Sequence, residues 1–75
     1  MVSQSFRLIF PSSLHDEPII NNLMRRFSFT VNILRANVAS DEGWIDIELS
    51  GRMPEIEESL LWLREQGVEV VLLTN

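Results

Sequence analysis

The first pattern in the chain is an alternation of apolar and polar residues. Over residues 5–10 the side chains of Phe6, Leu8 and Phe10 share one face, and Ile9 lies on the other. A period of two residues is that of a β-strand with one buried face. The pattern therefore predicts a first strand whose core face is formed by the two phenylalanines and the leucine.

The next apolar residues have the spacing of a helix. Within residues 17–27 they recur on one helical face: Ile19, Ile20, Leu23, Met24 and Phe27. Asp16 is placed to cap the start of this helix, and Pro18 fits its first turn, where a missing N–H costs nothing. The sequence therefore predicts a helix that begins directly after Asp16.

Residues 30–38, TVNILRANV, are rich in strand formers but do not alternate cleanly. Ile33 lies on one face of the predicted strand, whereas Asn32, Leu34 and Ala36 share the other. The apolar character changes face between Ile33 and Leu34, which indicates either a β-bulge or a strand that is partly covered on both faces. The sequence leaves both alternatives open.

A hairpin loop over residues 39–43 leads to a third strand over residues 44–50. The side chains directed to its core face are Ile45, Ile47 and Leu49. Those directed outward are Trp44, Asp46, Glu48 and Ser50. Asp46 and Glu48 are interpreted as solvated acids that keep an exposed strand face soluble, rather than as an acid–base pair or ligands of a hard cation.

A second helix and a fourth strand complete the chain. Pro54 is placed to open the helix, and Gly67 is placed to close it in the left-handed conformation. Residues 68–73, VEVVLL, are predicted to form the last strand.

The element order β-α-β-β-α-β predicts an α+β fold of the ferredoxin-like type: a four-stranded antiparallel sheet with two helices on one face. Right-handed crossovers place the first and third strands at the centre. We expect one domain over residues 1–75, with its core at about 6–73. The second sheet face has no cover, and its apolar side chains, Ile9 and Trp44 among them, are expected to meet a partner.

Composition narrows the classes of function. The chain carries eleven acidic and six basic residues, all of the latter arginine, for a net charge of −5, and it has no cysteine. We expect no nucleic-acid partner, because phosphate neutralisation dominates that affinity, and no disulfide or cysteine-ligated metal. The lack of disulfides favours the cytoplasm. No signal-peptide layout is present, and apolar runs such as residues 70–73 are too short to span a bilayer, so no membrane partner is expected.

No residue pattern points to catalysis. The single histidine, His15, has no serine or second histidine in a recognisable arrangement and is interpreted as a loop or cap residue. No glycine-rich phosphate-binding motif is present. The sequence therefore predicts no catalytic residue, no metal site, no cofactor and no enzymatic activity.

Four segments resemble the NIL domain family: FP…EPII, VNILRANV, GWIDIELSG and LREQGVEVVLL. The family takes its name from the tripeptide that stands here as Asn32-Ile33-Leu34. The resemblance extends from about Phe6 to Leu73 and implies a ferredoxin-like βαββαβ unit. Such units are found at the C-terminus of the ATPase subunit of methionine ABC importers and fused to ferredoxin-type iron–sulfur modules.

The resemblance implies a regulatory amino-acid sensor. The domain would pair with its twin and bind methionine or a related amino acid near the interface of the pair. Asn32 is the candidate ligand contact, because an amide can both donate and accept hydrogen bonds, and Ile33, Leu34 and Ala36 would be its apolar neighbours. Alternatively, Asn32 is an edge-strand residue whose amide is satisfied by water or by the opposite strand.

Two functions of different class follow. The first is a homodimeric sensor of a small amino acid. The second is a protein-interaction module that docks a larger partner through the open sheet face and has no small ligand. The expected interface residues are Trp44 and Ile9, and a homodimer is expected to have Trp44 or the strand over residues 30–38 near its contact. A sensor requires a concave site with convergent polar groups, whereas an interaction module requires only the flat apolar face.

Overall fold

The computed structural model describes residues 1–14, 16–39 and 41–74 of the chain. Its elements, in chain order, are β1 (Val2–Pro11), the short 3-10 helix η1 (Ser12–Leu14), α1 (Ile19–Arg26), β2 (Thr30–Asn37), β3 (Glu42–Gly51), α2 (Met53–Glu65) and β4 (Glu69–Thr74). The order of strands and helices is the one that the hydrophobic pattern predicts. The interpretation of His15 concerns a residue outside the described ranges.

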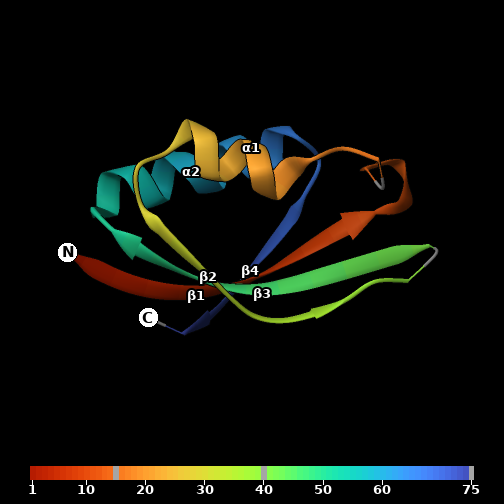
Figure 1. Cartoon of the computed structure of the whole chain (residues 1–75), viewed down its shortest axis with the longest axis horizontal. Helices are drawn as coiled ribbons and strands as arrows, with labels where there is room; N and C mark the ends of the chain where they lie inside the picture. Colours follow the sequence, from red (N-terminus) through yellow and green to blue (C-terminus); the bar gives the residue numbers. More distant parts are fainter. Residues whose placement is uncertain (15, 40, 75) are drawn as a thin grey trace.

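The four strands form one sheet in the order β2-β3-β1-β4, and every neighbouring pair is antiparallel. Figure 1 shows both helices on the same face of this sheet. The predicted α+β, ferredoxin-like architecture is confirmed, with the first and third strands at the centre. The last strand pairs with the first, as that topology requires, and Val70 lies opposite Leu8.

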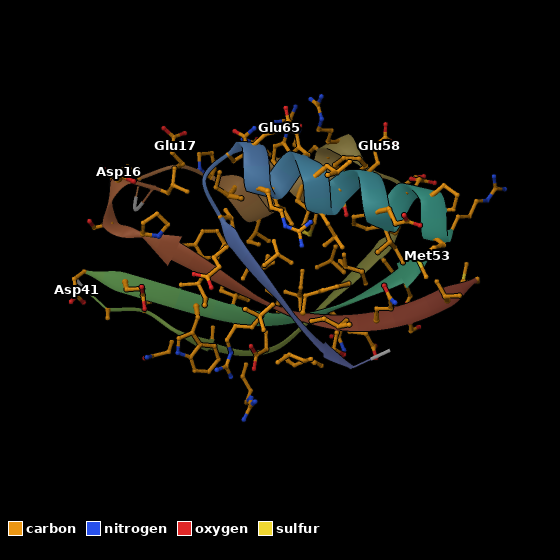
Figure 2. All side chains as sticks on the ribbon, turned by 180° about the vertical axis from the view of Figure 1, so that it is seen from behind. Asp16, Glu17, Asp41, Met53, Glu58 and Glu65 are labelled. Atoms are coloured by element: carbon orange, nitrogen blue, oxygen red, sulfur yellow. The ribbon has the colours of Figure 1, made fainter. Side chains whose placement is uncertain are left out.

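The core lies between the helices and the sheet. Its buried apolar side chains come from β1, α1, β3, α2 and the residue just before β4: Phe6, Leu8, Ile19, Leu23, Ile47, Leu49, Ile56, Leu63 and Val68. Each such side chain contributes roughly 1.5–3 kcal/mol when it leaves water completely. Figure 2 shows that Glu58 and Glu65 point away from this layer, on the solvent side of α2.

Helix α1 begins later than the sequence predicts. The N-cap is Pro18, no side chain caps this end, and Asp16 is exposed, so the predicted capping role of Asp16 is wrong. The reason is a turn just before the helix, in which the N–H of Glu17 donates to the carbonyl of Leu14 at 3.0 Å. The chain around Asp16 is still part of that turn, and the first turn of α1 keeps N–H groups without an intrahelical acceptor.

Strand β2 contains the β-bulge that the sequence left open. Ile33 pairs with Ile47 of β3 and Arg35 pairs with Asp46, so the ladder passes over Leu34. Beyond the bulge the faces are exchanged, because side chains alternate along a strand. The predicted grouping of Ala36 with Asn32 on one face is therefore wrong: Asn32 lies opposite Glu48 on the outer face, whereas Ala36 lies opposite Ile45.

The C-terminus of α2 is closed by backbone hydrogen bonds around Gly67. The N–H of Gly67 donates to the carbonyl of Arg64 at 3.0 Å, and the N–H of Val68 donates to the carbonyl of Leu63 at 3.1 Å. Gly67 has a φ of +96°, which confirms the predicted left-handed cap. Leu63 and Val68 are both buried, so the same turn directs the chain from α2 into the core.

Replacement of Gly67 tests this cap. Gly67→Ala is expected to lower the free energy of unfolding by about 1 kcal/mol, because an L side chain disfavours this φ. A Cβ at this position would meet its nearest atom, Leu14 Cδ1, at 3.6 Å, an ordinary contact, so steric overlap adds little. Urea denaturation measures the change.

Gly67→Asn is the matched control, since asparagine tolerates the left-handed region better than alanine. It should lose less stability than Gly67→Ala. Equal losses in the two variants would show that the backbone conformation is not what this position requires.

Candidate functional site

A buried carboxylate lies on the sheet face opposite the helices. Asp46 Oδ1 accepts a hydrogen bond from Arg7 Nε at 2.8 Å, and Asp46 Oδ2 accepts from Arg7 Nη2 and Arg35 Nη2, each at 3.0 Å. The Asp46 side chain is only 1% exposed. The prediction of a solvated acid at this position is therefore wrong, because register brings an arginine from each neighbouring strand directly opposite Asp46.

The bulge in β2 decides which residue meets Asp46. In a regular ladder continuing from Ile33, Leu34 would lie opposite Asp46, and Arg35 would lie on the helix side opposite Ile45. The extra residue instead places Arg35 on the outer face. The bulge in the edge strand β2 thus brings a second arginine to the carboxylate of Asp46.

Trp44 lies beside the same ion pairs. The guanidinium carbon of Arg7 is 4.1 Å from the centroid of the Trp44 ring, and that of Arg35 is 6.0 Å away. Both distances fall in the range of cation–π attraction. Ile9 is the cross-strand neighbour of Trp44. Four residues, here called the outer-face cluster, thus place charged groups beside the tryptophan on the open face of the sheet: Arg7, Arg35, Asp46 and Trp44.

The two arginines hold the pKa of Asp46 below its ordinary value. The hydrogen bond from Arg7 is the largest cause, burial acts in the opposite direction, and the hydrogen bond from Arg35 adds to the lowering. The hydrogen bond between Arg7 and Asp46 also raises the pKa of Arg7. At neutral pH both partners are therefore charged, and the cluster is an ion-pair network.

Asp46→Asn should make the domain less stable at neutral pH. The pKa of Asp46 is lower in the folded chain than in the unfolded chain, where an aspartate has a pKa of about 3.9. Its ion pairs therefore stabilise the fold at any pH above about 3.9, and this stabilisation is lost as the pH falls through the pKa of the folded state. The difference between Asp46→Asn and the native chain should therefore shrink towards zero in strong acid. Urea unfolding at about pH 7 and about pH 3 measures it.

Glu48→Gln is the control for this measurement. Glu48 lies on the same face of β3 and forms no ion pair within the part of the chain that the structure describes. Its replacement should change stability little at either pH. An equal loss for both variants would mean that general charge, rather than the ion pairs of Asp46, is responsible.

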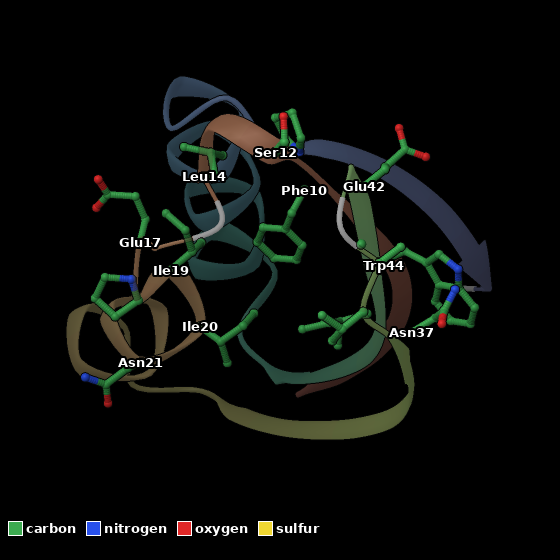
Figure 3. Close-up of a pocket in the computed structure, with 16 residues that line it drawn as sticks. Phe10, Ser12, Leu14, Glu17, Ile19, Ile20, Asn21, Asn37, Glu42 and Trp44 are labelled. Atoms are coloured by element: carbon green, nitrogen blue, oxygen red, sulfur yellow. The ribbon is translucent and has the colours of Figure 1, made fainter.

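A cavity of about 280 Å³ opens at the end of the domain where β1 runs into η1 and α1, beside the β2–β3 hairpin. Figure 3 shows Phe10 near its centre, between Ile20 of α1 and the hairpin. Apolar side chains form most of the lining: Phe10, Leu14, Ile19, Ile20, Val38, Trp44 and Ile45. The longer polar side chains among the lining residues are those of Glu17, Asn21, Asn37 and Glu42.

The structure separates the residues of the NIL tripeptide region. Asn32 is exposed on the outer face of β2, and Ile33 and Leu34 are 54% and 47% exposed along this edge strand. Ala36, also exposed, lies on the helix side, opposite Ile45. None of these four residues lines the cavity, which begins further along β2 at Asn37. The predicted ligand-binding group therefore spans two faces of one edge strand.

Sequence reasoning missed the cavity entirely. Its walls come from β1, the start of α1 and the β2–β3 hairpin, which are distant in sequence and meet only in the folded chain. The one local signal is Val38, an apolar residue that lies in the hairpin rather than in the strand and is 76% exposed. Among the described residues, no helix has the length and apolarity needed to cross a bilayer, and no group of three potential metal ligands is present.

The fold and its surfaces define a class of protein: a small ferredoxin-like α+β domain with an exposed edge strand and a small cavity at one end. Within this class the chain belongs to the NIL domain family, whose sequence model matches residues 4–71. The resemblance noted in the four sequence segments is thereby confirmed.

Two relatives show that similar sequences occur both in long and in short proteins. The chain is 35% identical over 74 residues to "Methionine import ATP-binding protein MetN" of Helicobacter pylori, covering 93% of this chain and 23% of that protein. It is 27% identical over 73 residues to an uncharacterized protein of Synechococcus elongatus, covering 93% of this chain and 90% of that protein. The chain thus spans under a quarter of the importer ATPase but nearly all of the small cyanobacterial relative.

A solved structure supports the same assignment. The C-terminal domain of an ABC transporter ATP-binding protein from Enterococcus faecalis superposes with a TM-score of 0.80 at 25% sequence identity. The match covers 96% of this chain and 84% of that one. The domain fold therefore occurs both as part of transporter ATPases and in small proteins of similar length to this chain.

Proposed function

We propose that this chain is a non-enzymatic regulatory domain of the cytoplasm that binds a small amino acid, such as methionine, and acts as a homodimer. The proposal rests on membership in the NIL domain family and on relatives named as methionine import ATP-binding proteins. The observation that carries it is the exposure of the NIL tripeptide on β2, a strand at the edge of the sheet.

An edge strand offers a surface for a second copy. The outward edge of β2 has backbone N–H and C=O groups without a neighbouring strand in the described chain, and such edges pair readily with another strand. The aliphatic side chains Ile33 and Leu34 of β2 are 54% and 47% exposed, and Val38, just after the strand, is 76% exposed. A twin packed along β2 would cover them and bring Asn32 to the interface, where an amino acid could contact both copies.

The amide of Asn32 suits such a ligand. It can donate to a carboxylate and accept from an ammonium group, and in the register it lies opposite the carboxylate of Glu48. In this proposal Asn32 contacts the polar groups of the amino acid, and Ile33, Leu34 and Ala36 are apolar neighbours that the two copies share.

Calorimetric titration with the common amino acids tests ligand binding. Asn32→Ala should weaken the binding of the best ligand by roughly ten- to a hundredfold, since a hydrogen bond to a charged group is lost. Thr30→Ala, also an exposed outer-face residue of β2, is the matched control and should bind like the native chain. If no amino acid binds the native chain, the sensor function is wrong.

Light scattering at micromolar concentration tests self-association. The native chain should be a dimer, and Leu34→Lys should shift it to monomer, because a charge would enter the paired β2 edge. Val71→Lys, at the opposite edge of the sheet on β4, should leave the dimer intact. A native chain that is monomeric in this range would contradict the homodimer.

A second function, a protein-interaction module, is favoured by one observation. The outer-face cluster presents a tryptophan and two arginines, residue types that are enriched at interaction hot spots. Arg35 is 68% exposed in its side chain and so remains accessible to a partner. In this alternative Trp44 and Ile9 form the contact, and Trp44→Glu abolishes partner binding while no amino acid binds.

A further inference from the structure

We propose that the cavity at the end of the domain is a second binding site, separate from the NIL tripeptide, for a small apolar amine. The ligand would place its hydrocarbon part against Phe10, Ile20 and Ile45 and its ammonium group towards the carboxylates of Glu17 or Glu42. This site is independent of the proposed amino-acid site on β2, because Asn32 does not line the cavity.

The size of the cavity restricts its occupant. A volume of about 280 Å³ lies just below the range of about 300–1,000 Å³ that holds drug-sized ligands. Apolar side chains form the centre, where Phe10 projects between Ile20 and the hairpin (Figure 3). A small hydrocarbon body therefore fits better than a polar or extended molecule.

The charges of the lining favour a cation. Glu17 and Glu42 are the charged residues of the lining, and no arginine is among the residues that the structure describes there. The two glutamates lie on different sides of Phe10 in Figure 3. Neither forms an ion pair within the described ranges, so both carboxylates remain available to an ammonium group. The net charge of −5 adds a long-range attraction for cations.

One feature of the lining favours an anion instead. The start of α1, at Ile19 and Ile20, borders the cavity without a capping side chain, and a helix N-terminus carries a partial positive charge. Glu17 lies one residue before the N-cap, Pro18, and its full negative charge offsets this partial one. A free carboxylate on the ligand would therefore be disfavoured, which separates this site from one for amino acids.

Four molecules with one hydrocarbon skeleton test the proposal: 3-methylbutylamine, 3-methylbutan-1-ol, 4-methylpentanoate and leucine. They are titrated into the isotopically labelled native chain at neutral pH and followed by amide chemical shifts. The amine should shift Phe10, Ile20 and Ile45 and bind about two- to fivefold more tightly than the alcohol, as expected for an exposed ion pair. Leucine and 4-methylpentanoate should bind more weakly than the amine.

Variants separate charge from shape. Glu17→Gln combined with Glu42→Gln should bring the amine to the affinity of the alcohol, whereas Asn32→Ala should change neither. Ile20→Trp should fill the cavity and abolish the shifts from both ligands, and its thermal unfolding is compared with that of the native chain. If Ile20→Trp does not fold, the double glutamine variant still decides the role of charge.

Three outcomes would overturn the proposal. Equal affinities for the amine and the alcohol would remove the role of the carboxylates. Tighter binding of leucine or 4-methylpentanoate would assign the site to a carboxylate. Shifts that cluster at Asn32 instead of Phe10, or no shifts with any of the four molecules, would show that the cavity is not a binding site.

Discussion

The carboxylate of Asp46 links three neighbouring strands on the sheet face that the helices leave open. It accepts hydrogen bonds from Arg7 of β1 and Arg35 of β2 while standing on β3. A buried carboxylate without partners would be strongly unfavourable, so its burial requires both arginines in place. The Trp44 ring lies beside these arginines, so the buried carboxylate is surrounded by side chains of the sheet itself.

This arrangement depends on the bulge at Leu34, which decides which side chains of β2 lie on each face of the sheet. Because the ladder passes over Leu34, Arg35 reaches the outer face and Ala36 turns to the helix side. Ile33 and Leu34 are exposed along β2, which lies at the edge of the sheet. The extra residue in β2 therefore supplies the second arginine of the ion-pair network, whereas the edge position of the strand accounts for the exposure of the NIL tripeptide.

The surfaces proposed for binding lie in different parts of the domain. The β2 edge, with Asn32, is suited to a second copy and a ligand shared between copies. The cavity around Phe10 is lined by residues of a single chain and opens where β1 and the hairpin end. A 75-residue domain has a thin core, so incomplete coverage at the sheet's edge and end is physically expected. Apolar surface is accessible at both places, at Ile33 and Leu34 on the β2 edge and at Phe10 in the cavity.

Residue periodicity alone determined the element order, the core face of β1 and the closure of α2 at Gly67, because these depend on local spacing and backbone conformation. Four sequence segments were enough to indicate the family. Tertiary structure decided the rest. Alternation placed Asp46 outside the helix layer, but only strand register showed that Arg7 and Arg35 bury it. The cavity around Phe10 likewise exists only when distant segments meet, and the one local signal, the exposed Val38, does not show which segments line it.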